Sequence, residues 1–144
     1  MNANIDGHWW SGDARSIWTI NLNRTLPLSL NIDSGASDMN IDLSQVRTKD
    51  INVKTGVSRL DLKLGGSEDI TTANIDSGVS SITVHVPNGV GVQLKLDSGL
   101  TIKNLADLSS TGDKLYESAG YNQSSHKSNI VGKLGLSSFT IERY

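Results

Sequence analysis

Residues 74–80 read NIDSGVS, and this stretch recurs with small changes along the chain. Three segments align with it without gaps: 31–37 (NIDSGAS), 52–58 (NVKTGVS) and 95–101 (KLDSGLT). A fifth segment, 133–141 (KLGLSSFTI), matches the second half of the unit. The glycines stand at positions 35, 56, 78, 99 and 135, so successive steps are 21, 22, 21 and 36 residues, and the last step contains an insertion. A repeat of this length is typical of one turn of a solenoid, in which each coil stacks on the next.

Apolar columns appear when positions are counted from each glycine. They lie three residues before it and one, four and six residues after it, as Ile75, Val79, Ile82 and Val84 show for the third unit. Polar residues alternate with them, so the pattern predicts strands with one buried and one wet face. The column one residue after the glycine is expected to be buried with the others; it contains Ala36, Val57, Val79, Leu100 and Leu136.

The glycine of each unit is expected to turn a corner, because only glycine adopts positive φ without steric cost. The column two residues after it contains small hydroxyl residues, Ser37, Ser58, Ser80, Thr101 and Ser137. These hydroxyls are expected to hydrogen-bond the backbone at the corner.

The pattern predicts an all-β, single-domain, right-handed β-solenoid over residues 1–144. We expect an N-terminal cap with a first coil at 1–30, regular repeats at 31–108, an insertion loop on the surface at 109–130 and a final coil at 131–144. A cap is expected because a solenoid exposes unpaired strand edges at its ends. The 144 residues suffice for one core without metals or disulfides, and the chain contains no cysteine.

The composition argues against several chemical functions. A net charge of −2 creates no field that would attract nucleic acid. The histidines His8, His85 and His126 lie far apart in the sequence, and no G-x-S-x-G motif occurs, so a metal site or nucleophilic catalysis is not predicted. We therefore predict no catalytic, cofactor-binding or metal-binding residues and no cofactor.

One acidic and basic column raises the question of a calcium or sugar site. The column two residues before the glycine reads Asp33, Lys54, Asp76, Asp97 and Lys133. Lys54 would neutralise its neighbours, and two carboxylates supply too few oxygens for calcium, so a solvated, partly paired face is favoured.

The candidate interaction surface lies where the repeat fails. The aromatic start of the chain contributes Trp9, Trp10 and Trp18, which suit core capping, a membrane interface or a sugar-stacking platform. In the fourth unit Lys103 interrupts an apolar column, and the insertion carries Tyr116 and Tyr121. These six residues are the predicted site.

Several of these segments resemble the toastrack family, which includes the C-terminal domain of LiaF-type cell-envelope stress regulators and adhesin-like domains. The resemblance covers about residue 18 to the end and rests on 28–37 (LSLNIDSGAS), 40–44 (NIDLS), 52–58 (NVKTGVS), 75–87 (IDSGVSSITVHVP), 116–121 (YESAGY) and 135–142 (GLSSFTIE). It implies a bacterial, non-enzymatic, all-β domain that takes part in the response to cell-wall-active antibiotics, and it transfers no catalytic residue.

The function expected from this resemblance is that of a sensory or protein-interaction domain associated with the cell membrane. Its partner would be a membrane sensor or histidine kinase, and its tether would be a transmembrane segment that this chain lacks. The cytoplasmic face is the favoured side. The solenoid ends could also pair into homo-oligomers. The alternative is a surface adhesin or glycan-binding solenoid, and a polysaccharide-cleaving β-helix enzyme is the least favoured reading.

Overall fold

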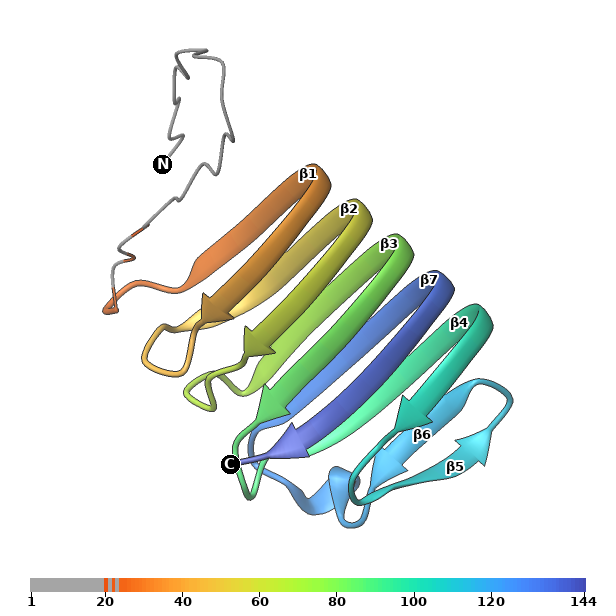
Figure 1. Cartoon of the computed structure of the whole chain (residues 1–144). Helices are drawn as coiled ribbons and strands as arrows, with labels where there is room; N and C mark the ends of the chain where they lie inside the picture. The colour runs from red at the N-terminus through yellow and green to blue at the C-terminus, as the bar shows by residue number, and fades with distance from the viewer. Residues whose placement is uncertain (1–19, 21, 23) are drawn as a thin grey trace.

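The computed structural model describes residues 20, 22 and 24–144, and these form one sheet of seven strands in the order β1-β2-β3-β7-β4-β6-β5. The β-solenoid predicted from the repeat is confirmed, because five long strands pair in parallel as successive coils (Figure 1). The long strands are β1 (Leu28–Asp42), β2 (Thr48–Lys63), β3 (Ile70–Val86), β4 (Gly91–Asn104) and β7 (Lys127–Arg143). The insertion contains β5 (Leu108–Gly112), β6 (Leu115–Ser118) and the 3-10 turn η1 (Tyr121–Gln123).

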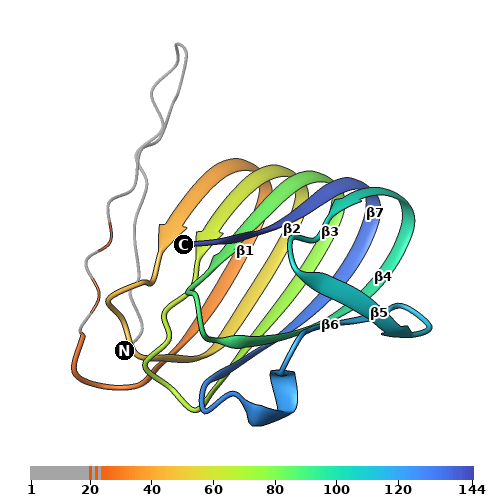
Figure 2. The ribbon, with the colours of Figure 1, turned by 90° about the horizontal axis from the view of Figure 1, so that it is seen from below.

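Each long strand bends near its glycine into two legs, so that the sheet forms an arch (Figure 2). The apolar columns three residues before the glycine and four and six residues after it meet inside the arch, as predicted. Their members in β2, β3 and β7 are buried: Val53, Leu60, Leu62, Ile75, Ile82, Val84, Phe139 and Ile141. In β1, at the end of the stack, the equivalent residues Ile32, Met39 and Ile41 are only partly buried.

The column one residue after the glycine was predicted to be buried, and this prediction is wrong. In β3, Ser77 and Ser80 are buried, whereas Gly78 and Val79 between them are both exposed. The bend therefore places two successive residues on the outer side and shifts the alternation by one position. As a result, apolar side chains occupy the outside of the bend while hydroxyl side chains occupy its inside.

The glycines of the repeat do not have positive φ, which corrects the reason given for them; among the described glycines only Gly89 and Gly120 do. Glycine is required at these positions because neighbouring coils pack closely against each other. A Cβ on Gly56 would lie 2.7 Å from the carbonyl oxygen of Gly35, and one on Gly78 would lie 2.8 Å from that of Gly56. A side chain at these positions would therefore collide with the backbone of the neighbouring coil.

The hydroxyl column was predicted to bond the backbone at the corner, and this too is wrong. Ser80 Oγ and Ser137 Oγ lie 3.2 Å apart and bond each other. The hydroxyl oxygens of Ser37, Ser58 and Thr101 have no hydrogen-bond partner in the structure. Small size explains these residues better than bonding, because the inside of a tight bend has little room for longer side chains.

The final coil does not follow the fourth one in space. β7 lies between β3 and β4, and the glycines stay in register because Leu136 pairs with both Val79 and Leu100 (Figure 1). This order places Phe139 in the middle of the core. Its partner on β4, Lys103, lies in the last long coil and is exposed. A lysine is tolerated there because its ammonium group can reach solvent.

The segment 109–130, expected to be a surface loop, contains an antiparallel pair of short strands. β6 pairs with the first leg of β4, and β5 pairs with β6. Leu105, Leu108 and Tyr116 pack against the core, so this segment closes the end of the arch beside β4 (Figure 2). At the opposite end, Leu22 and Leu28 pack against the core, while most of the predicted cap at 1–30 lies outside the described residues.

Candidate interaction surface

Lys103 and Tyr116, two of the predicted site residues, contact each other. Lys103 Nζ donates a hydrogen bond of 2.9 Å to the Tyr116 hydroxyl and lies 5.2 Å from the centroid of its ring. Tyr116 is paired with the buried Leu94, which places its side chain on the core side of the sheet. The pair therefore lies at the end of the arch beside β4, which β5 and β6 close.

Tyr121 lies on the other face of the sheet. Its hydroxyl donates a 2.6 Å hydrogen bond to Asn129 Oδ1, and Lys127 Nζ lies 5.6 Å from its ring centroid. Asn129 pairs with Gln93, the neighbour of the inward-facing Leu94, so it faces outward. Burial, and to a smaller extent the charge of Glu117, raises the pKa of Tyr121. The remaining predicted residues, Trp9, Trp10 and Trp18, lie outside the described residues.

The acidic and basic column becomes a fully alternating series in the observed strand order. Its members pair as Asp33, Lys54, Asp76, Lys133 and Asp97 from β1 to β4. Lys114 extends it, because its Nζ lies 2.8 Å from Asp97 Oδ1. The hydrogen bond from Lys114 and its charge lower the pKa of the Asp97 carboxyl. We call these six residues the charge ladder; the expected partly paired, exposed face is what the structure contains.

Beside the charge ladder, on the outside of the bend, lies the misassigned apolar column. Val57, Val79, Leu136 and Leu100 are 58%, 49%, 55% and 75% exposed. Their cross-strand pairing makes them one continuous stack, with Ala36 at the β1 end. We call these five residues the apolar ladder.

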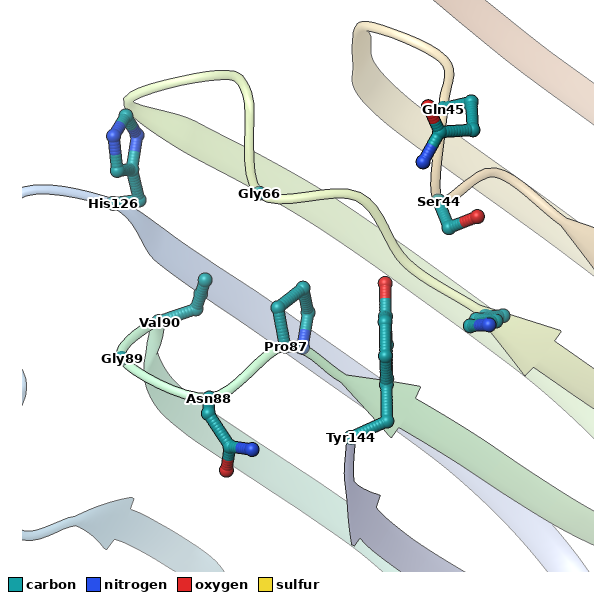
Figure 3. A pocket seen from close by; sticks show the side chains of 10 residues that line it. Ser44, Gln45, Gly66, Pro87, Asn88, Gly89, Val90, His126 and Tyr144 are labelled. Carbon is teal, nitrogen blue, oxygen red and sulfur yellow. The ribbon is translucent and has the colours of Figure 1, made fainter.

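An open pocket of about 540 Å³ lies on the side of the coils that faces away from the bend. Figure 3 shows Ser44 and Gln45 at one end and His126 at the other. Tyr144 lines it, donates a 2.5 Å hydrogen bond to the Leu64 carbonyl and has Lys63 Nζ 4.4 Å from its ring centroid. Burial, followed by the charge of Asp42, raises the pKa of Tyr144.

The two described histidines, His85 and His126, lie in separate surroundings. His85 lies between two carboxylates, with Nε2 3.1 Å from Asp61 Oδ1 and Nδ1 3.3 Å from Glu142 Oε2. His126 Nδ1 lies 2.9 Å from the Glu68 carbonyl oxygen. Within the described part of the chain, no group of three or more histidine, cysteine or acidic side chains could hold a metal ion.

Arg143 joins the pocket to the end of the fourth coil. Its Nε and Nη2 donate to the two carboxylate oxygens of Asp107 at 2.9 and 3.0 Å, and its Nη1 donates to the Val90 carbonyl at 2.8 Å. The Arg143 hydrogen bond, and to a smaller extent its charge, holds the pKa of Asp107 below its usual range, although burial opposes this shift. The bidentate pair ties β7 to the turn after β4.

Asp107→Asn should therefore reduce stability at neutral pH by about 1 kcal/mol, since the pair is partly exposed and screened by solvent. The folded-state pKa of Asp107 lies below the unfolded-state value, so the contribution is present above about pH 5 and disappears as the pH falls through the folded-state pKa. Urea unfolding of both proteins between pH 2 and pH 7 measures this difference. A difference that does not shrink toward pH 2 would contradict the assignment.

Comparison with known proteins identifies the family. The family model described as the N-terminal domain of toast_rack, DUF2154, matches residues 2–85, more than half of the chain. The chain belongs to the toast_rack family. The matched part of this toast_rack chain ends within β3, and no curated protein matches the chain.

A solved structure extends the toast_rack likeness beyond the matched residues. It is the crystal structure of a putative cell adhesion protein from Clostridium sporogenes, 27% identical in sequence, with a TM-score of 0.80. The alignment covers 85% of the toast_rack chain and 58% of the other chain, so the clostridial protein is considerably longer than the shared region. Family and neighbour together fit a non-catalytic interaction domain.

Proposed function

We propose that the chain is a sensory and protein-interaction domain of a bacterial regulator of the cell-envelope stress response. It would act by binding a membrane partner such as a histidine kinase. The observation that carries this proposal is membership in the toast_rack family. The structure supports it with stacked ladders of exposed side chains on the outside of the coils, which offer an extended surface to a protein.

The end of the arch beside β4 is the part of the surface best suited to recognise one partner. The other coils present similar kinds of side chain at equivalent positions, whereas Lys103, Tyr116 and the β5–β6 segment occur once. Ile102 on β4 is the most exposed large apolar residue of the described chain. A unique combination of an ammonium group, a phenol and apolar side chains gives the specificity that a repeated surface lacks.

The domain would work at the cytoplasmic face of the membrane, held there by a transmembrane tether. In the described residues no helix is long and apolar enough to span a bilayer.

A genetic experiment tests the proposed role. Deletion of the gene in its host should shift the concentration of a cell-wall-active antibiotic that induces an envelope-stress reporter, and the wild-type gene should restore it. An unchanged induction curve in the deletion strain would contradict the proposal.

A crosslinking experiment tests the surface. A benzophenone amino acid at position 103 should yield an adduct with a membrane histidine kinase when membranes are irradiated, whereas one at position 70 should not. Ile70 is a suitable control because it is also exposed but lies at the start of β3. Adducts at both positions, or at neither, would exclude the β4 end as the specific contact.

The alternative is an adhesin or glycan-binding domain, which the description of the clostridial structure favours. Tyr121, with its ring beside Lys127, is a described aromatic residue that could stack on a sugar. A glycan array on which wild type binds and Tyr121→Ala does not would support this alternative. Absence of binding together with a shifted induction curve would favour the regulator.

A further inference from the structure

The apolar ladder is exposed and is not part of the core of the fold. Its side chains point away from the core, and four of its five members are 49–75% exposed. With strands about 4.8 Å apart, the five coils give a continuous apolar stripe about 19 Å long. Contiguous exposed apolar side chains bordered by charges are typical of protein interfaces.

We infer that two copies of this chain associate through their apolar ladders in an antiparallel arrangement. The charge ladder alternates strictly: Asp33, Lys54, Asp76, Lys133, Asp97 and Lys114. A series of six alternating charges has opposite signs at its two ends. When one copy is reversed against the other, every negative residue therefore faces a positive one.

The pairs in such a dimer follow from a two-fold axis between β3 and β7. Asp76 faces Lys133 of the second copy, and Lys54 faces its Asp97. In the neighbouring column, Val79 faces Leu136 of the second copy and Val57 faces Leu100. Both ladders are thus complementary in the same arrangement, as an interface built from the same patch on both subunits requires.

A parallel arrangement of the two copies is disfavoured by charge. A two-fold axis along the stack would place the charge ladder of one copy against the column three residues after the glycine of the other. That column begins with Asp38 and Arg59, so Asp33 would face Asp38, and Lys54 would face Arg59. Two successive like-charge contacts oppose this geometry.

Sedimentation of the full chain tests the association. The wild-type protein should form a dimer, and Val79→Thr combined with Leu136→Thr should raise its dissociation constant about tenfold or more. Ile70→Thr, a matched loss of an exposed apolar residue outside the ladder, should leave the dissociation constant unchanged. Thermal unfolding of the variants verifies that they fold. A monomeric wild type, or equal effects of the ladder and control variants, would overturn the inference.

Disulfide crosslinking tests the direction, because the chain contains no cysteine of its own. Val57→Cys and Leu100→Cys are made as separate variants. In the antiparallel dimer, identical positions lie three coils apart, about 14 Å, which is too far for a disulfide. Oxidation should therefore crosslink a mixture of the two variants and neither variant alone. Crosslinking of each variant by itself, or of no sample, would overturn the antiparallel arrangement.

Discussion

Phe139→Ala is expected to lower the free energy of unfolding by about 4 kcal/mol. Phe139 is the largest of the fully buried side chains, and it lies on β7, in the interior of the sheet. Ile82 on β3 is its partner on one side, and Lys103 on β4 is its partner on the other. Because Lys103 is exposed and its ammonium group bonds the Tyr116 hydroxyl, it is poorly placed to fill the cavity.

Leu136→Ala is the matched control on the same strand. Leu136 lies three residues before Phe139 but on the outside of the bend, so its loss should change the free energy of unfolding by less than about 0.5 kcal/mol. Urea unfolding should be measured at concentrations below dimer formation, where the apolar ladder is free. Equal losses in the two variants would contradict the opposite placement of these side chains.

The repeat made the coil and most of its core predictable. Period-two alternation on each side of the glycine identifies Ile75, Ile82 and Val84 as members of one buried face, and the spacing identifies one coil per unit. These features depend on local pattern and on parallel register, which equivalent positions of a repeat share.

The exposure of the column one residue after the glycine could not be predicted from the hydrophobicity of its residues. The bend shifts the alternation by one residue, so Val79 faces outward although its apolar character suggests the core. The hydroxyl residues on both sides of the glycine carried the missing signal. Ser77 and Ser80 keep the inner parity, and small polar residues at both inner positions indicate a tight corner.

The strand order was detectable in principle from two charges. In sequential order, Asp76 would lie beside Asp97, and like charges directly opposite each other are destabilising. Placing Lys133 between them removes the repulsion, and the structure contains this order. Lys103 gives the same information, because a lysine in an inner column suits an end coil.

The candidate site was predictable only in part. Lys103 and Tyr116 were singled out because they interrupt the repeat, and the structure brings them together. The pocket was missed, because Lys63 at the end of β2, His126 before β7 and Tyr144 after it lie far apart in the sequence and carry no common motif. Residues that only the stacking of coils brings together have no recognisable spacing in the sequence.

Gly78→Ala is expected to lower the free energy of unfolding by about 3 kcal/mol, whereas Gly35→Ala should be neutral or stabilising by up to about 1 kcal/mol. The two glycines lie in nearly identical segments, NIDSGVS and NIDSGAS, and neither has positive φ, so intrinsic backbone preference is matched. They differ in their surroundings. The new Cβ at Gly78 would lie 2.8 Å from the carbonyl oxygen of Gly56, while no described atom lies within 4 Å of the one at Gly35.

The contrast isolates the role of stacking, because the clash exists only where another coil lies on that side of the glycine. Relief at Gly78 would require β2 and β3 to separate, and their backbone hydrogen bonds and packed side chains resist this. Thermal and urea unfolding of both variants measure the difference. Similar losses at both positions would instead indicate a local conformational requirement for glycine, and no loss at Gly78 would show that the coils can separate at little cost.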